Sequence, residues 1–86
     1  MDATEMELAG QIKKHRQALG ISQEALAEKI YVSRQTISNW ETGRTYPDVQ
    51  SLLLLSVAFD ISIDELIKGD VKTMEESVRK ADHSLI

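Results

Sequence analysis

The chain of 86 residues is 42% hydrophobic and 28% charged, which suits one small domain with a single core and leaves no room for a second. It contains no cysteine, which excludes disulfides, thiolate metal sites and a cysteine nucleophile, and its longest apolar run, Leu52–Leu55, is far too short for a membrane span. The formal net charge is −4, but the charges are unevenly distributed. Residues 11–46 carry six basic and three acidic side chains, whereas residues 47–86 carry four basic and eight acidic ones. Only the first half could therefore face phosphate.

Start and stop signals predict three short helices in the first half of the chain. The first begins at the capping box of residues 4–7, with Thr4 as the cap, and ends at Gly20. Ser22 is expected to cap the second helix and Ser33 the third, which ends at Gly43. The apolar positions of these helices are Leu8, Ile12, Leu19, Ala25, Leu26, Ala27, Ile30, Ile37 and Trp40. This helical spacing, together with the absence of alternating β-branched runs, predicts an all-α domain.

Two further helices are expected after the loop at residues 44–47. The fourth helix runs from Asp48 to Phe59. Its core face is formed by Leu52, Leu55 and Phe59. A second capping box at residues 62–65 opens a short fifth helix that ends at Gly69.

The tail carries an apolar seam at helical spacing. Its members are Val71, Met74, Val78, Ala81 and Leu85. Three interpretations stay open: a sixth helix docked on its own domain, a dimerising helix, or a linker to a segment outside this sequence. We therefore divide the chain into a domain at residues 1–70 and an amphipathic C-terminal helix or linker at residues 71–86.

The most specific pattern lies in residues 23–40, where two short helices are joined by a turn of three or four residues and Ala27 stands where the helices come closest. This is a helix-turn-helix pattern. The stretch GISQEALAEKIYVSRQTISNWETGRTYPD resembles the DNA-binding domain of the Cro and phage-repressor class, the Xre-like family of bacterial regulators, and the resemblance covers residues 11–69. It implies a five-helix, lambda-repressor-like domain whose recognition helix, at about residues 33–42, enters the major groove of double-stranded DNA.

The resemblance also implies which residues contact DNA. On the outward face of the recognition helix it places Arg34, Gln35, Ser38 and Asn39. Gln35 and Asn39 suit adenine edges, and Arg34 suits guanine or phosphate. Contacts to the DNA backbone are expected from Gln23, Ser33, Thr36, Arg44 and Tyr46. For two of these residues a purely structural role is the alternative: Ser33 serves only as an N-cap, and Gln23 is only a surface amide. Trp40 is expected in the core.

An ion pair between Arg16 and Glu41 is a further expectation from the family pattern. It would tie the first helix to the end of the third helix beside the DNA backbone. At a partly wet site, such a pair contributes little to stability, on the order of 0 to 1 kcal/mol. Its expected value is therefore orientation.

Two features depart from the expected pattern. Tyr31 stands at a turn position where the family often has Gly or Asn in a left-handed conformation, which would strain a tyrosine by on the order of 1 kcal/mol unless the turn is shaped differently. The fourth helix carries apolar residues beyond its core face, namely Leu53, Leu54 and Val57. Because exposed apolar surface of this kind marks a partner, we expect one of these three to contact either the Val71–Leu85 seam or a second subunit.

The leading functional hypothesis is a sequence-specific transcriptional regulator, expected to be a repressor, that binds DNA as a homodimer. The alternative is an antitoxin or adaptor that binds proteins through the fourth helix and the tail, with DNA binding secondary. A third reading is the DNA-reading head of a longer sensor. His15 and His83 lie far apart and no phosphate-binding loop is present, so we expect no enzyme, no metal and no cofactor. The expected location is the cytoplasm, on the nucleoid when bound to DNA, without membrane contact.

Overall fold

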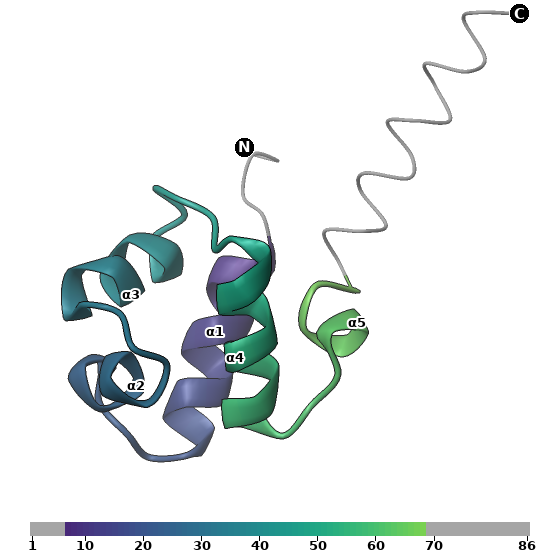
Figure 1. The fold of residues 1–86 in the computed structure, drawn as a ribbon, viewed down its shortest axis with the longest axis horizontal. Coiled ribbons are helices and arrows are strands. Elements are labelled where there is room, and N and C mark those ends of the chain that lie inside the picture. Colours follow the sequence, from purple (N-terminus) through teal and green to yellow (C-terminus); the bar gives the residue numbers. More distant parts are fainter. Residues whose placement is uncertain (1–6, 69–86) are drawn as a thin grey trace, which may run out of the picture.

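The computed structural model describes residues 7–68, which form five helices joined by short loops (Figure 1). The helices are α1 (Glu7–Ala18), α2 (Gln23–Lys29), α3 (Arg34–Glu41), α4 (Val49–Phe59) and α5 (Ile63–Leu66). No strand occurs in this part of the chain. The expected all-α fold with five helices is confirmed. The capping box at Thr4, the seam from Val71 to Leu85 and the boundary at residue 70 lie outside the described residues.

A side-chain oxygen caps the N-terminus of each helix from α2 to α5. The caps, each with the residue whose N–H it accepts, are Ser22 with Ala25, Ser33 with Thr36, Asp48 with Ser51 and Ser62 with Glu65, at 2.8–3.1 Å. The capping roles expected of Ser22, Ser33 and Ser62 are thus present, and α4 begins one residue after its Asp48 cap. The hydrogen bond from the Ser51 N–H lowers the pKa of the Asp48 carboxyl below its ordinary value, because it favours the ionised form.

Four of the helices end at a residue with a left-handed backbone. The angle φ is +70° at Gly20 and +79° at Gly43, and it is +63° at Tyr31 and +58° at Asp60. In each case the N–H of the residue after the left-handed one donates to the carbonyl of the residue five positions before the donor. The Val32 N–H, for example, donates to the Ala27 carbonyl at 3.0 Å. Glycine adopts this conformation without strain, whereas tyrosine and aspartate do not. The turn geometry that the sequence left open at Tyr31 is therefore the left-handed one, and the left-handed residue at Asp60 was not foreseen.

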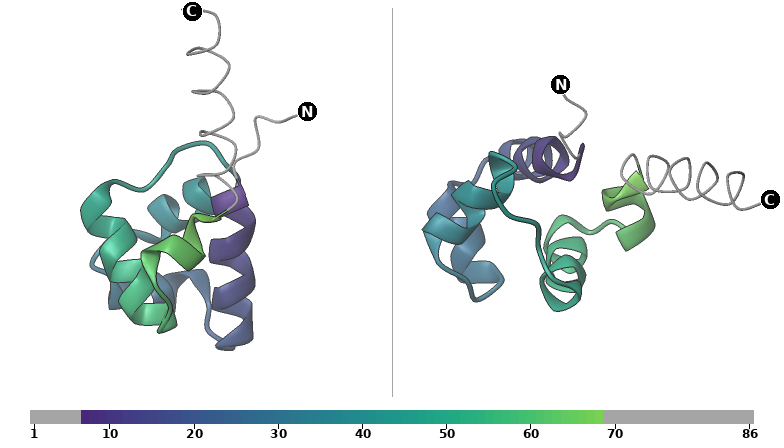
Figure 2. Two further views of the ribbon diagram at one scale, coloured as in Figure 1. Left: turned by 90° about the vertical axis from the view of Figure 1, so that its right-hand side faces the viewer. Right: turned by 90° about the horizontal axis from the view of Figure 1, so that it is seen from above.

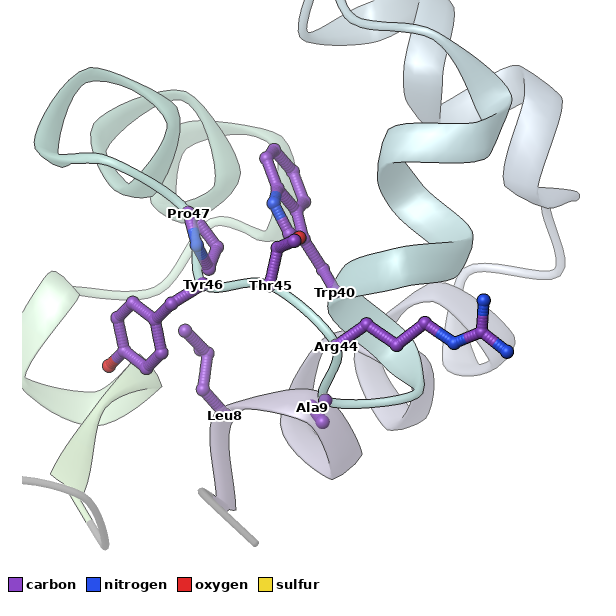
Figure 3. Close-up of a pocket in the computed structure, with 8 residues that line it drawn as sticks. Leu8, Ala9, Trp40, Arg44, Thr45, Tyr46 and Pro47 are labelled. Atoms are coloured by element: carbon purple, nitrogen blue, oxygen red, sulfur yellow. The ribbon is translucent and has the colours of Figure 1, made fainter. Parts of the chain in front are cut away.

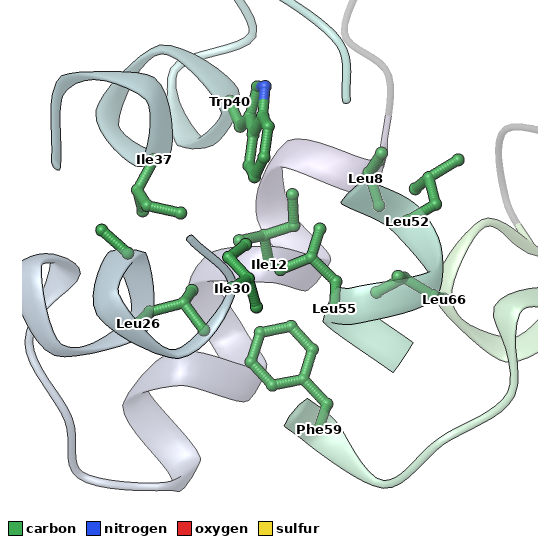
Figure 4. Close-up of a cluster of buried hydrophobic side chains, with 11 residues drawn as sticks. Leu8, Ile12, Leu26, Ile30, Ile37, Trp40, Leu52, Leu55, Phe59 and Leu66 are labelled. Atoms are coloured by element: carbon green, nitrogen blue, oxygen red, sulfur yellow. The ribbon is translucent and has the colours of Figure 1, made fainter. Parts of the chain in front are cut away.

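All five helices contribute to one core (Figure 4). Its buried hydrophobic residues are Leu8, Ile12, Leu26, Ala27, Ile30, Ile37, Trp40, Leu52, Leu55, Phe59 and Leu66. Trp40 is only 5% exposed, as expected of a core residue, whereas Leu19 lies beyond the end of α1 and is 49% exposed. Helix α1 lies centrally: it contacts α3, α4 and α5, while α2 packs on α3 (Figure 2).

The apolar residues of α4 divide into three groups. Leu52, Leu55 and Phe59 are buried as expected. Leu54, which we expected outside the core, packs against its edge instead. Val49, Leu53 and Val57, which are spaced four residues apart and are 72%, 51% and 76% exposed, form what we call the α4 stripe. The expected contact of Leu53 or Val57 with the Val71–Leu85 seam or with a second subunit stays a prediction, because the seam lies outside residues 7–68.

None of the helices in residues 7–68 combines the length and the apolar character that crossing a bilayer requires.

Candidate nucleic-acid interface

Helices α2 and α3 form a rigid pair because small and branched side chains fill the space between them. Ala27 is 2% exposed, and Leu26 and Ile37 are fully buried. The Val32 N–H, bonded to the Ala27 carbonyl, closes the turn with Tyr31 at its left-handed position. The orientation of α3 relative to the rest of the domain is therefore fixed by packing and by backbone hydrogen bonds.

Helix α3 has one buried and one polar face. Ile37 and Trp40 face the core, whereas Arg34 and Gln35 are exposed. Thr36, Ser38 and Asn39 are half-buried at the edges of the exposed face. The outward face thus carries one guanidinium and neutral amide and hydroxyl groups, and it has no acidic side chain between residues 34 and 40.

The hydroxyl groups at the start of α3 are already engaged. Ser33 Oγ accepts the Thr36 N–H at 3.1 Å, and it lies 2.9 Å from Thr36 Oγ1. The capping role of Ser33 is therefore present. Both residues lie at the helix end where Arg34 and Gln35 project, so each retains the position that a phosphate contact would require.

Gln35 and Asn39 lie one turn apart and are joined by a side-chain hydrogen bond. Gln35 Nε2 donates to Asn39 Oδ1 at 3.2 Å. From the sequence we expected two separate readers of bases, whereas the structure pairs the two amides. Their i, i+4 spacing was the available signal, because amide pairs at that spacing face each other on a helix.

Arg16 and Glu41 are joined by two hydrogen bonds between α1 and α3. Arg16 Nε donates to Glu41 Oε2 at 2.7 Å, and Nη2 donates to Oε1 at 3.1 Å. Arg16 Nη1 also donates to the Ile21 carbonyl at 2.9 Å. The Glu41 hydrogen bond is the main reason that the pKa of Arg16 is raised above its ordinary value.

The two side chains of this pair are 13% and 3% exposed, for Arg16 and Glu41 respectively. The side chains of the pair are thus less exposed to water than we expected, and the contribution of the pair to stability stays a prediction. Removing one partner of a shielded pair leaves a buried charge without compensation. The pair joins α1 to α3, and we expect it both to orient the two helices and to contribute to stability.

Glu41 also holds Gln23, the first residue of α2. Gln23 Nε2 donates to Glu41 Oε1 at 3.0 Å. Gln23 is therefore more than a surface amide, because its side chain is hydrogen-bonded to the Arg16–Glu41 pair. An amide nitrogen has two N–H groups, so one remains for another acceptor.

The loop after α3 brings the last two expected contact residues to different sides. Arg44 extends away from Leu8 and Pro47, whereas the Tyr46 ring lies on the Leu8 side of the loop (Figure 3). A shallow cavity of about 160 Å³ lies among Leu8, Trp40, Tyr46 and Pro47. Arg44 is exposed, and Tyr46 is 41% exposed.

No group of three or more histidine, cysteine or acidic side chains in residues 7–68 is placed to hold a metal ion. The polar groups of α3 and the loop are donors and acceptors on an open surface.

Two crossed helices with a tight turn, the second presenting a polar outer face, define a helix-turn-helix domain. The chain belongs to the helix-turn-helix family, which matches it over residues 12–66. The resemblance to the Cro and phage-repressor class is confirmed by the relatives and solved structures to which the chain is similar.

Two curated relatives illustrate this similarity. The HTH-type transcriptional activator BcrR of Enterococcus faecalis is 43% identical over 65 residues, which cover 76% of this chain and 32% of that protein. The repressor protein C2 of Salmonella phage P22 is 43% identical over 60 residues, which cover 70% of this chain and 28% of that protein. The chain thus spans less than a third of the length of either relative.

Solved structures agree with the fold. The crystal structure of the P22 c2 repressor in complex with the synthetic operator 9T has a TM-score of 0.69 and 40% sequence identity, and covers 72% of this chain and 94% of that chain. The restriction-modification controller protein C.AhdI of Aeromonas hydrophila has a TM-score of 0.67 and 30% identity, and covers 71% of this chain and 92% of that chain.

Proposed function

We propose that this domain binds double-stranded DNA sequence-specifically through the outward face of α3 and regulates transcription as a homodimer. The observation that carries the proposal is the chemistry of that face, on which an arginine and two amides stand together without an acidic neighbour. A solvated helix face would usually carry Glu and Lys instead. Amide and guanidinium groups match the donor and acceptor pattern of bases in the major groove.

Base contacts are assigned to the side chains at the centre and N-terminal end of α3. Gln35 reads an adenine edge, and Arg34 reads guanine or holds a phosphate. Ser38 and Asn39 complete the face that enters the groove.

Contacts to the DNA backbone are assigned to the rim of this face. Gln23, Ser33, Thr36, Arg44 and Tyr46 set the position of the domain on the duplex without reading its sequence. The bond from Gln23 to Glu41 supports this assignment, since it fixes the amide beside α3 with an N–H to spare. Through the same carboxylate, Arg16 holds α1 and α3 in register with the phosphates.

A homodimer is proposed because one recognition helix makes too few base contacts for specific affinity. Two joined domains add their contacts and read two half-sites about 34 Å apart, one turn of the double helix. We assign the α4 stripe to the contact with the second copy. The stripe supports this role because it is apolar, exposed and carried by a helix without any charged residue.

The protein-binding alternative is not favoured, because the named relatives are regulators of transcription. We propose repression through occupancy of an operator, because the P22 relative is named a repressor and its solved structure is a complex with a synthetic operator. The protein is placed in the cytoplasm, on the nucleoid when bound to DNA.

The proposal is tested by selection from a pool of randomised duplexes, with sequencing of the retained fraction. We expect a two-fold symmetric site for the wild type, a less defined site for Gln35→Ala, and an unchanged site for Gln50→Ala, a matched exposed glutamine on α4. A wild type that enriches no sequence would contradict the proposal.

A further inference from the structure

The amide pair on α3 constrains what each of its members can do. Gln35 Nε2 has two N–H groups, and one of them is donated to Asn39 Oδ1 at 3.2 Å. When the donated N–H is the one that points away from Oε1, the other N–H lies beside Gln35 Oε1 on the same edge of the planar amide. That edge holds one donor and one acceptor, which is what bidentate bonding to N7 and N6 of adenine requires.

The pair also decides which way round the Gln35 amide lies. A free glutamine exchanges its nitrogen and oxygen positions by rotation about its last bond, and only one of the two orientations matches adenine. Asn39 presents an acceptor oxygen, so the orientation with Nε2 toward Asn39 is stabilised. The Gln35 side chain is then ordered before DNA binds, so the entropy lost in ordering it does not reduce the free energy of binding.

Hydrogen bonds to the backbone carbonyl of Asn39 anchor this residue near the end of α3. The Asn39 carbonyl accepts the Arg44 N–H at 2.9 Å, the Thr45 N–H at 3.4 Å and the Thr42 hydroxyl at 3.2 Å. Asn39 is also half-buried, whereas Gln35 is exposed. The more constrained residue of the pair therefore lies where it can orient the more exposed one.

We propose that Asn39 is a positioning residue for the base specificity of this domain, acting through Gln35 and not as a second reader of adenine. The inference rests on the proposed function, because it assigns how the face of α3 achieves its specificity. It revises the expectation from the sequence, in which both amides read bases independently. One adenine in each half-site is read by Gln35, and Asn39 sets how well that adenine is distinguished.

The test compares duplexes that carry adenine or 7-deazaadenine, which lacks the N7 acceptor, at each adenine of the selected site. The quantity measured is the ratio of the two dissociation constants. For the wild type we expect a ratio of about 5- to 150-fold at one adenine of the half-site, the range of a bidentate contact. Gln35→Leu abolishes this ratio. Asn39→Leu, which keeps the side-chain shape and removes the acceptor, lowers the ratio at the same adenine by about 1.4- to 2.3-fold, the range of one amide pair on a helix surface.

Two further variants separate positioning from general effects. Asn39→Asp keeps the acceptor oxygen, so the ratio is retained although binding to every duplex weakens through repulsion from the phosphates. In a Gln35→Leu background, Asn39→Leu causes no further change in the ratio. In the free protein, Asn39→Leu is expected to increase the mobility of the Gln35 side-chain amide measured by 15N relaxation.

The outcomes distinguish this inference from the function on which it rests. A wild type that reads a site, with Gln35→Leu and Asn39→Leu losing discrimination at different base pairs, would overturn the inference alone. An unchanged ratio in Asn39→Leu, or an unchanged mobility of the Gln35 amide, would do the same. A wild type that binds all duplexes equally would overturn the proposed function and this inference together.

Discussion

Replacing Tyr31 with glycine should stabilise the domain, although tyrosine is the larger side chain. Tyr31 is held at φ +63°, where a residue other than glycine costs about 1–2 kcal/mol. Glycine forfeits about 0.5–1 kcal/mol because it gains freedom in the unfolded chain. The ring is 84% exposed, so its removal loses little buried surface. We therefore expect Tyr31→Gly to raise the free energy of unfolding by about 0.75 kcal/mol, the middle of a range of about 0–1.5 kcal/mol.

Thermal and urea unfolding followed by circular dichroism measure this change, which corresponds to an increase of about 2–8 °C in Tm for a domain of this size. Tyr31→Ala is the matched control, because it removes the ring and keeps the Cβ that causes the strain. We expect the alanine variant to be no more stable than the wild type. If glycine and alanine at this position give equal stability, the left-handed strain is not what the structure indicates, and the reasoning fails.

Three other predictions follow from contacts of named residues. Arg16→Ala should lower the free energy of unfolding by about 3 kcal/mol because it removes the cationic partner of the 3%-exposed Glu41 carboxylate and leaves it the Gln23 amide; a urea titration that shows a loss below 1 kcal/mol would return the pair to the class of surface ion pairs. The hydrogen bond from the Ser51 N–H lowers the pKa of Asp48, so the contribution of this cap to stability is present above the unfolded pKa of about 3.8 and is lost as the pH falls through the lower folded pKa. Lowering the pH from 5 to 2 should therefore reduce the Tm of the wild type more than the Tm of Asp48→Asn, whose cap does not titrate. Parallel curves of Tm against pH would refute this assignment. The double variant Leu53→Ser, Val57→Ser should sediment as a monomer at concentrations where the wild type and the exposed control Leu19→Ser are dimers, and a dimeric double variant would remove the α4 stripe from the interface.

The fold followed from the sequence because its signals are local and agree with one another. Serines at residues 22, 33 and 62 stand where helices begin, and glycines at residues 20 and 43 stand where helices end. The left-handed residue Asp60 carried no such signal, because aspartate is more often found as an N-cap or in turns of other types. The burial of Leu54 was missed for another reason: its position on the helical wheel lies at the edge of the core face, where only the tertiary packing decides.

The sequence predicted which residues lie on α3, but it did not predict the hydrogen bonds between their side chains. The spacing and the family resemblance indicated which residues stand on α3, but hydrogen bonds between side chains depend on rotamers and on the crossing of helices. For that reason the bond between Gln23 and Glu41 and the pairing of Gln35 with Asn39 became apparent only in the structure. The exposure of the Arg16–Glu41 pair was misjudged for the same cause, since the pair is shielded by elements that lie far from it in the sequence.

The central claim is that the outward face of α3 reads bases. It is tested most directly by the ratio of dissociation constants for a random duplex and for the selected site, measured by fluorescence anisotropy at one fixed salt concentration, because phosphate contacts make the affinity depend on salt. The account predicts a large ratio for the wild type and for Gln50→Ala, and a ratio about 5- to 150-fold smaller for Gln35→Ala. Equal ratios for Gln35→Ala and Gln50→Ala would contradict it, because the face of α3 would then carry no sequence information.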